Sequence, residues 1–464
     1  MSKSHLIRLK STCPSLLMKV ALIAILLIAM FTVVLYAWVD FDINERLGTL
    51  ETSLNTVTSS NSSIQEYTYS VYIDGDYYCA KNGITGLVDY RSRNASDVIN
   101  NAINNARNGV VLIRKGTYII TAPINIHEHI QLWGEGIGAT ILQLHDGANC
   151  NLLQYVSSEN SVFAEIAYMT LNGNNGFNDV GSGIYIAPKG DGTLWDLSLR
   201  ELFIIWFADC GIETTQTWGY SFFHIVSEYN SVAGMRIAGG SSCHVSNSKF
   251  MLNDGNGVSV VGGGFVDFES TDFRLNGKNG LYINGTACEL DGCHIVGNSR
   301  SDYNMSSGIQ IGRGGSNTRI ISCEFNGLNK EEYGLHISDK FVVGTVVIGN
   351  TFYGQLTAPM FTSDANVFVH YNGGFITEKS GLAPSCVNGT WIAHGLYAAP
   401  NGRCDLTIEE SRYVNATCYL LDPTIIAENS THVQIEFVCI NNGAIAPVGK
   451  IESRSISWYF EYKP

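Results

Sequence analysis

The stretch that decides the fold reads Gly257-Val258-Ser259-Val260, then Val266-Asp267-Phe268-Glu269, and ends at Phe273 and Asn276. Its first element, glycine-apolar-variable-apolar, occurs at seven positions, starting at Gly183, Gly211, Gly234, Gly257, Gly280, Gly308 and Gly334. The starting glycines are 28, 23, 23, 23, 28 and 26 residues apart. This recurrence indicates one structural unit repeated along the chain, with connecting loops of varying length.

A second element lies between the glycine segments. It reads Cys243-His244-Val245-Ser246 before Phe250, Val266-Asp267-Phe268-Glu269 before Phe273, Cys288-Glu289-Leu290-Asp291 before Ile295, and Thr318-Arg319-Ile320-Ile321 before Phe325. Each unit thus holds short strands of period two, separated by bends at which Gly or Asn can adopt left-handed dihedrals. Wound in parallel, such units stack apolar residues inward and asparagines such as Asn253, Asn276 and Asn298 into ladders. The pattern predicts an all-β solenoid, a parallel β-helix.

Composition agrees with this class and limits the partners. Only 15% of the 464 residues are charged, and 48 are glycine, which favours short strands joined by tight turns. The formal net charge is -14, and no Lys/Arg cluster follows the N-terminal tail. Because phosphate binding needs a basic face, we expect no nucleic-acid partner.

The N-terminal region predicts a membrane anchor. Residues 20–39 carry no charge and are long enough to cross ~30 Å of hydrocarbon. Positive residues precede this segment and acids follow it, so residues 1–19 are expected in the cytoplasm and the bulk of the chain outside the cell. A cleaved signal peptide is the alternative, but the apolar run exceeds a typical h-region and no small-x-small site ends it.

Residues 40–66 are expected to form a stalk. Apolar residues recur there at coiled-coil spacing, namely Ile43, Leu47, Leu50, Leu54 and Val57. This predicts either an oligomerising stalk, which would make the protein a homo-oligomer such as a trimer, or a plain helical linker. Eleven of the 12 cysteines follow the cytoplasmic tail, an odd number that cannot all pair within one chain. Sequons begin at Asn61, Asn94, Asn284, Asn304, Asn388, Asn415 and Asn429, as expected for a glycosylated surface.

The start of the solenoid has the features of a cap. Apolar residues recur at helical spacing between Asn94 and Ala106, with Ser96 as the expected N-cap. The following segment, Gly109 to Leu142, predicts short strands broken by Gly and Pro. A helix in this position can cover the open end of a solenoid.

Residues from about Asp74 to Phe375 resemble the pectate-lyase-like right-handed β-helix superfamily. The resemblance rests on the cap helix, on Gly109-Val110-Val111-Leu112-Ile113-Arg114-Lys115-Gly116-Thr117-Tyr118, and on Leu132-Trp133-Gly134-Glu135-Gly136. Arg114 stands where the family commonly has Pro. The resemblance implies a right-handed β-helix over residues 67–379 and a carbohydrate ligand. The polygalacturonase-type motifs and the full pectate lyase Arg motif are absent, so no family catalytic residue is carried over.

Residues 380–464 have a different texture, in which the glycine repeat ends and four cysteines occur, Cys386, Cys404, Cys418 and Cys439. Strands are predicted over 391–396, 403–409, 416–421, 433–440 and 456–462. This region resembles accessory β-sandwich modules that follow β-helices in surface and tail-fibre-like proteins. The resemblance implies a binding or oligomerising module.

Aligned coils place polar residues in two neighbouring outward columns, which predicts a catalytic patch of Asp267, Glu269, Glu289 and Asp291 with His294 and Arg319. Crowded like charges favour keeping one carboxyl protonated, and a proton donor beside a carboxylate suits acid/base glycoside chemistry. The same oxygens could instead hold Ca²⁺, with Arg319 as a base. The competing interpretation is solvated decoration, because outward residues of a β-helix are ordinarily polar.

A further outward column follows the glycine element and predicts substrate contacts, at Tyr185, Glu213, Arg236, Tyr282, Gln310 and His336, with Ser259 among them. Aromatic and amide side chains in line suit a sugar chain, but a solvated face is again the alternative. His127 and His129 alternate on one expected cap strand. Without a third ligand they are interpreted as an ordinary strand pair rather than a metal site.

These features leave two hypotheses open. The first is a membrane-anchored polysaccharide lyase or glycoside hydrolase that acts on an extracellular glycan through the acidic patch. The second is a non-catalytic glycan-binding adhesin or spike-like surface protein. Carbohydrate as the ligand rests on fold analogy alone.

Overall fold

The computed structural model describes residues 67–375, apart from 157–159, 191, 286, 302–304 and 363–366, and strands between Glu378 and Glu461. The predicted cytoplasmic tail, anchor and stalk lie outside the described residues. Within the described ranges, no helix is both long and apolar enough to cross a membrane. The anchor at 20–39 therefore stays a prediction.

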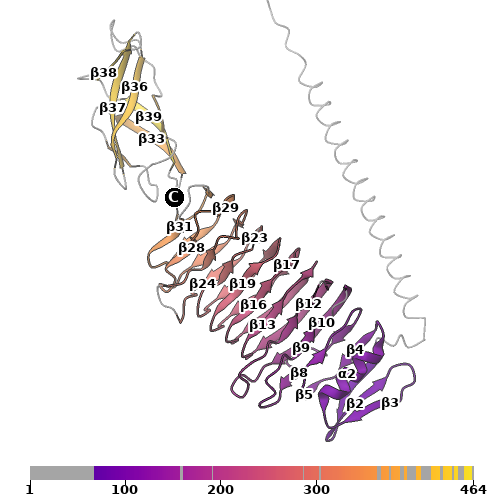
Figure 1. Cartoon of the computed structure of the whole chain (residues 1–464). Coiled ribbons are helices and arrows are strands. Elements are labelled where there is room, and N and C mark those ends of the chain that lie inside the picture. Colours follow the sequence, from indigo (N-terminus) through magenta and orange to yellow (C-terminus); the bar gives the residue numbers. More distant parts are fainter. Residues whose placement is uncertain are drawn as a thin grey trace, which may run out of the picture. The chain divides into compact units, whose positions relative to one another are not determined.

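Residues 110–370 form a parallel solenoid in which most coils have three strands (Figure 1). One strand of each coil belongs to a 10-stranded sheet, here sheet B. The rest of the coil belongs to a 22-stranded sheet, here sheet A, usually as two strands but as one continuous strand in β10 (Ser161–Asn172) and β12 (Leu194–Ile205). In one coil these are β19 (Asn256–Gly262) in sheet B and β20 (Val266–Glu269) and β21 (Asp272–Arg274) in sheet A. The predicted all-β parallel solenoid is confirmed.

The remaining strands of sheet B are β6 (Ile124–Asn125), β9 (Leu153–Tyr155), β11 (Ile184–Ile186), β13 (Cys210–Thr214), β16 (Ala233–Ala238), β22 (Leu281–Ile283), β25 (Ile309–Ile311), β28 (Tyr333–Ile337) and β31 (Ala358–Thr362). The solenoid strands of sheet A are β4 (Val110–Ile113), β5 (Gly116–Ile120), β7 (Gln131–Trp133), β8 (Thr140–Leu144), β10 (Ser161–Asn172), β12 (Leu194–Ile205), β14 (Thr217–Trp218), β15 (Ser221–Glu228), β17 (Cys243–Ser246), β18 (Lys249–Met251), β23 (Cys288–Asp291), β24 (His294–Val296), β26 (Arg319–Ile321), β27 (Glu324–Asn326), β29 (Thr345–Ile348), β30 (Thr351–Tyr353) and β32 (Val367–His370).

The glycine elements of the sequence are the strands of sheet B, and their apolar residues face the core. Val258 and Val260 on β19 lie beside Leu281 and Ile283 on β22, and all four are fully buried. Because side chains alternate across a strand, the intervening residues Ser259 and Tyr282 face outward. The alternation of apolar residues in the sequence therefore sets the register in which the coils stack.

A helix and three antiparallel strands cap the N-terminal end of the solenoid (Figure 1). The strands are β1 (Tyr69–Asp74), β2 (Tyr77–Asn82) and β3 (Val88–Ser92), and the helix α2 spans Ala95–Ala106. The apolar stripe of α2 is buried, as predicted. The predicted N-cap Ser96 is wrong by two residues: Asn94 is the N-cap, and its side chain accepts from the Ser96 N–H at 2.9 Å. The Ser96 hydroxyl instead accepts from Thr121 and Ala122, because it points across to the adjoining loop.

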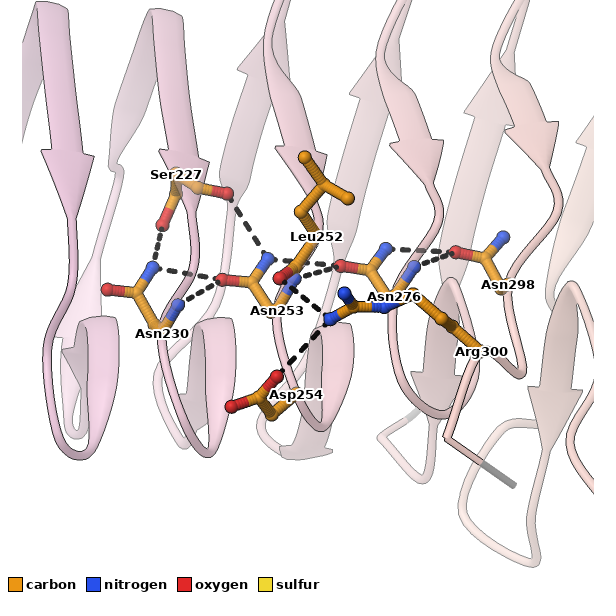
Figure 2. A network of polar contacts seen from close by, with 8 residues as sticks. All are labelled: Ser227, Asn230, Leu252, Asn253, Asp254, Asn276, Asn298 and Arg300. Atoms are coloured by element: carbon orange, nitrogen blue, oxygen red, sulfur yellow. Dashed lines mark hydrogen bonds and ion pairs between the residues drawn. The ribbon is translucent and has the colours of Figure 1, made fainter. Parts of the chain in front are cut away.

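The predicted asparagine ladder is present and buried (Figure 2). Asn230 Nδ2 donates to Asn253 Oδ1 at 2.9 Å, Asn253 to Asn276 at 3.0 Å, and Asn276 to Asn298 at 2.9 Å. Each accepting oxygen also takes the backbone N–H of the preceding asparagine, at 3.1 or 3.2 Å. The ladder thus satisfies polar groups at the bend where strand pairing stops.

The ladder explains the repeated glycine. A Cβ on Gly257 would lie 2.6 Å from Asn276 Nδ2 and 2.5 Å from the Gly280 carbonyl oxygen. Gly234 and Gly280 stand in the same relation to Asn253 and Asn298, at 2.8 and 2.7 Å from the amide nitrogen. Side chains at these positions are excluded because the ladder amide of the neighbouring coil fills the space.

The C-terminal residues form two antiparallel sheets. One contains β33 (Glu378–Cys386), β39 (Arg454–Glu461) and β35 (Cys404–Ile408), and the other contains β34 (Trp391–Ala393), β37 (His432–Asn441), β36 (Leu420–Glu428) and β38 (Ala444–Pro447). The sequence predicted four of these strands, β34, β35, β37 and β39, and missed β33 and β38; the strand predicted over 416–421 overlaps β36 only at residues 420–421. That the two sheets pack as a sandwich stays a prediction.

The expectation for the paired cap histidines is wrong in one respect. Strand β6 ends at Asn125, and His127 and His129 lie in the turn that follows, with His129 at φ 56°. His127 Nε2 lies 3.0 Å from the Ile103 carbonyl oxygen at the end of α2. The imidazole therefore joins the turn to the cap helix.

Candidate functional site

Sheet A carries the predicted acidic patch in the predicted register. His244, Asp267, Glu289 and Arg319 are successive neighbours on β17, β20, β23 and β26. In the adjoining column, Glu269 lies next to Asp291 on the neighbouring strand. The four carboxylates Asp267, Glu269, Glu289 and Asp291 therefore lie on two adjacent coils, whose strands are ~4.8 Å apart. We refer to them as the acidic cluster.

Most of the acidic cluster is engaged by basic side chains. His244 Nδ1 lies 2.9 Å from Asp267 Oδ2, and His244 Nε2 lies 3.7 Å from Glu269 Oε2. Arg319 Nε is 3.7 Å from Glu289 Oε2. Asp291 is the one carboxylate of the cluster without such a partner among the residues that the structure describes.

A corner of the backbone separates the acidic cluster from a second set of polar residues. Ser270 turns the chain between β20 and β21 with φ 47°, and the corresponding corners are His224, Asn247 and Gly292, with φ 53°, 49° and 60°. Such left-handed dihedrals bend a strand within one residue. As a result, Asp272 follows Glu269 around the corner.

Beyond this corner, Asp272 and His294 form a pair on adjacent strands. His294 Nδ1 lies 2.8 Å from Asp272 Oδ1. The Asp272 side chain is only 16% exposed, whereas that of His294 is 54% exposed. The carboxylate is therefore held against the protein surface, and the far edge of the imidazole is reachable.

The pair opens onto a hollow of about 350 Å³ at the corner. Its lining comes from four successive coils: His224, Asn247, Ser248, Lys249, Ser270, Asp272, Gly292 and His294. Lys249 neighbours Asp272 on the adjacent strand, and Arg274 Nη1 lies 4.0 Å from Asp272 Oδ2. We call this feature the corner hollow. It combines two histidines, a carboxylate and a lysine in a space that is open to solvent.

The pair fixes which nitrogen of the neutral imidazole carries the hydrogen. An ionised carboxylate can only accept hydrogen bonds, so Nδ1 of His294 carries the hydrogen. In the neutral ring Nε2 then has a free lone pair, on the exposed side. This is the arrangement of a general base whose orientation is set by a second residue.

Sheet B carries the predicted substrate column, also in register: Tyr185, Glu213, Arg236, Ser259, Tyr282, Gln310 and His336. Several members contact one another or the scaffold. Arg236 Nη1 lies 2.6 Å from Glu213 Oε1, and Asn279 Nδ2 donates to Gln310 Oε1 at 3.1 Å. Burial beside Tyr333 and Phe361 lowers the pKa of His336. The two predicted sets of site residues lie on different sheets, and the structure does not bring them together.

The sequence reasoning missed His224, Lys249 and the hollow itself. A signal for Lys249 was present, because it precedes Phe250 as Asp272 precedes Phe273 and His294 precedes Ile295. Throughout the described ranges, no group of three or more His, Cys, Asp or Glu residues is placed to hold a metal ion. Binding of Ca²⁺ by the acidic cluster stays a prediction.

Comparisons with known proteins place this geometry in a wider context. Two overlapping segments, 155–325 and 233–355, match the family model described as right handed beta helix region. Residues 86–186 match the model described as rhamnogalacturonase A/epimerase, pectate lyase-like. No curated protein sequence matches the chain significantly.

Among the similar solved structures, one has the same fold and two others are more distant. ORF18 of Geobacillus virus E2 is 17% identical, with a TM-score of 0.53, over 76% of this chain and 75% of that chain. The mannuronan C-5 epimerase AlgE6 A-module of Azotobacter vinelandii is 17% identical, with a TM-score of 0.44, over 60% of this chain and 95% of that one. Tailspike gp49 of Acinetobacter baumannii bacteriophage Fri1, a capsular polysaccharide depolymerase, is 10% identical, with a TM-score of 0.39, over 79% and 82%.

The three-stranded coils, the stacked core and the cap helix define a right-handed solenoid. Together with the two matching family models, they show that the chain belongs to the right-handed parallel β-helix superfamily. Its cap and first coils are of the pectate-lyase-like kind.

Proposed function

We propose that this protein acts on an extracellular polysaccharide, either as a polysaccharide lyase with the corner hollow as its reaction site or as a glycoside hydrolase at the neighbouring acidic cluster. The observation that carries the proposal is the His294–Asp272 pair, which presents a reachable Nε2 in a hollow beside the acidic cluster. The pectate-lyase-like match supports a glycan as substrate by fold analogy.

In a lyase reaction, His294 Nε2 would take the proton next to the carboxylate of a uronic acid. The electron pair of that C–H bond forms the C4=C5 double bond. The bond from C4 to the leaving oxygen breaks with its electron pair going to that oxygen, which takes up a proton from water. Lys249 is placed to pair with the uronate carboxylate, which makes the proton easier to remove. Asp272 orients the ring and stabilises the imidazolium that forms.

Hydrolysis would instead use the acidic cluster. Its carboxylates lie on adjacent coils, and a separation of ~5 to 9.5 Å suits the retaining or inverting reaction. Asp291, which has no ion-pair partner among the described residues, is the candidate proton donor or base. Glu269 and Asp267 share His244 and would hold the substrate hydroxyls.

The second candidate is a non-catalytic glycan-binding adhesin or spike. It is favoured by the ion pairs of the acidic cluster, since three of its four carboxylates already face His244 or Arg319. We further propose, from the sequence, that residues 20–39 anchor the chain in the cell membrane with its bulk outside. On the same basis, residues 40–66 would gather chains into an oligomer such as a trimer.

The proposal is tested with the full-length chain on a panel of uronate and neutral polysaccharides, with and without Ca²⁺. Ultraviolet absorbance of the new double bond reports elimination, and new reducing ends report either cleavage. Substitutions Asp272→Asn and His294→Gln should each abolish cleavage at the corner hollow. Asp254→Asn, which changes an exposed carboxylate paired with Arg300, should leave it intact.

The outcomes distinguish elimination at the corner hollow, hydrolysis at the acidic cluster and non-catalytic binding. Cleavage lost in Asp291→Asn but retained in His294→Gln would move the reaction to the acidic cluster and indicate hydrolysis. Retention of a polysaccharide without cleavage, by the parent and by every variant, would establish the adhesin and exclude the catalytic role.

A further inference from the structure

Two exposed tryptophans stack on one another on sheet A. Trp195 on β12 and Trp218 on β14 are neighbours in register. Their ring centroids are 5.6 Å apart with an interplanar angle of 21°. Trp195 is 44% exposed and Trp218 36%. Indole rings usually bury most of their surface, so a stacked pair that faces solvent calls for an explanation.

The pair is held in place before any ligand arrives. Trp195 Nε1 donates to Thr193 Oγ1 at 2.9 Å, and that hydroxyl donates to Asn160 Oδ1 at 2.9 Å. Each tryptophan is followed by a left-handed residue, Asp196 with φ 56° and Gly219 with φ 68°. Fixed side chains lose little conformational entropy on binding, which favours a recognition role.

The residues that follow the tryptophans leave room beside the rings. Ser198 and Ser221 are the next outward neighbours along the strands, and Arg200 and Phe223 come after them. Arg200 is paired with Glu165, and its guanidinium lies over the Tyr168 ring, 4.6 Å from the centroid. Small hydroxyl side chains thus separate the two tryptophans from Arg200 and Phe223, beyond the corners at Asp196 and Gly219.

The pair is also continuous with the candidate site. Trp218 bridges to Ser241, and Ser221 is the neighbour of His244 on β17. His244 in turn contacts Asp267 of the acidic cluster. A chain laid along the solenoid axis over Trp195 and Trp218 would reach Ser241 on the next coil, ~4.8 Å further on, and His244 follows Ser241 beyond the left-handed corner at Ser242.

We propose that Trp195 and Trp218 form a stacking platform for pyranose rings of the polysaccharide, as a binding subsite on the N-terminal side of the corner hollow. The C–H face of a pyranose packs on an indole face, and the serine hydroxyls and the Arg200–Glu165 pair are placed to bind its hydroxyl groups. This inference rests on the proposed glycan ligand and gives it a location and a direction along the solenoid.

A second copy of the chain is a poorer occupant. A stable protein interface buries ~800 Å² on each partner, whereas here the two rings are followed along the strands by serines and an ion pair. Val162, the exposed neighbour of Trp195, and Phe223 extend the apolar surface only slightly, and rings flanked by hydroxyls and an ion pair match a sugar chain better than an apolar protein surface.

The test compares Trp195→Ala, Trp218→Ala and the double variant with the parent full-length chain. Trp206→Ala is the matched control, because Trp206 is equally exposed, at 45%, and lies in a corner outside the platform. Affinity is measured by tryptophan fluorescence during titration with the polysaccharides that the parent retains. Each platform substitution should weaken binding about tenfold, which corresponds to about 1.4 kcal/mol, and Trp206→Ala should leave it unchanged.

Phenylalanine at either position should restore most of the affinity, which excludes a folding defect as the cause. The platform is overturned if the parent binds and the double variant binds equally well, and the proposed function then still stands. If the parent retains no polysaccharide of the panel, both the proposed function and the platform are wrong.

Discussion

Asn298 ends the asparagine ladder on a buried carboxylate: its backbone N–H and its side-chain amide both donate to Glu331 Oε1, at 2.9 and 3.0 Å. Glu331 is fully buried, and its other oxygen has no partner among the described residues. A Cβ on Gly308 would lie 3.0 Å from that oxygen. Glu331 thus takes the place of a ladder asparagine in the last coil of the series.

This position makes stability depend on pH. Burial raises the pKa of Glu331 from 4.5 to about 8. Between these values the folded protein binds one more proton than the unfolded chain at this residue, so stability falls as pH rises. Glu331→Gln keeps the acceptor oxygen and cannot ionise. We expect it to match the parent near pH 4.5 and to exceed it at pH 8, measured as urea midpoints. Glu332→Gln, only partly buried, is the control, and an unchanged pH profile in Glu331→Gln would contradict the prediction.

Breaking the ladder in its middle should destabilise the solenoid strongly. Asn276→Ala removes the acceptor for Asn253 and the donor to Asn298 and to the Phe250 carbonyl. Buried groups left without partners cost ~1 to 3 kcal/mol each, so we expect a loss of about 3 kcal/mol or more in denaturant unfolding. Asn326→Ala, whose partly buried side chain accepts from the Leu328 N–H and contacts Tyr353, should cost less than about 1 kcal/mol. Equal losses for both would argue against the ladder.

The repeated glycine can be tested independently. Gly257→Ala would place a methyl group 2.5 Å from the Gly280 carbonyl oxygen, so the coils must move apart. Overpacking of this kind costs ~1 to 3 kcal/mol. Gly176→Ala has open space around the new Cβ and should be close to neutral in the same thermal unfolding assay. Similar melting temperatures for the two variants would refute the steric explanation.

Thiol reactivity should follow burial. All seven cysteines between Cys79 and Cys323 are free, and six are buried while Cys150 is half-buried. A hydrogen bond with Cys323 and burial raise the pKa of Cys293, and burial raises the pKa of Cys288 to about 12. Since the thiolate is the reactive form, iodoacetamide should modify Cys150 before the other six of these cysteines in the folded protein. Peptide mass spectrometry before and after unfolding measures this, and early modification of Cys288 would contradict it.

Much of the solenoid could be predicted because its signals are local. Period-two apolar alternation placed Val258, Val260, Leu281 and Ile283 in the core, and the spacing of the repeats placed Asp267 beside Glu289. The helix cap and the corners of the coils were harder to predict from the sequence. Ser96 and Asn94 both suit an N-cap by type, and only the direction of the Ser96 hydroxyl, toward Thr121, distinguishes them.

The residues of the candidate site likewise divide into those that the sequence predicted and those that it missed. Asp267, Glu269, Glu289 and Asp291 were found from register alone. The tryptophan platform was missed, although Trp195 and Trp218 are 23 residues apart, which is the commonest spacing of the repeat. Outward residues bury little surface, so hydrophobic periodicity says which side they face and nothing about what they contact.

The sequence by itself determined the coil, its register and its inner side chains, because burial restricts the apolar positions of every repeat and the Gly–Asn contact restricts the central ones. Only the tertiary structure decided that His294 meets Asp272, that the corner at Ser270 opens a hollow, and that the column of Tyr282 lies on another sheet. These relations depend on left-handed corners of one residue each, and the direction in which a corner sends the next strand is set by the coils stacked on either side.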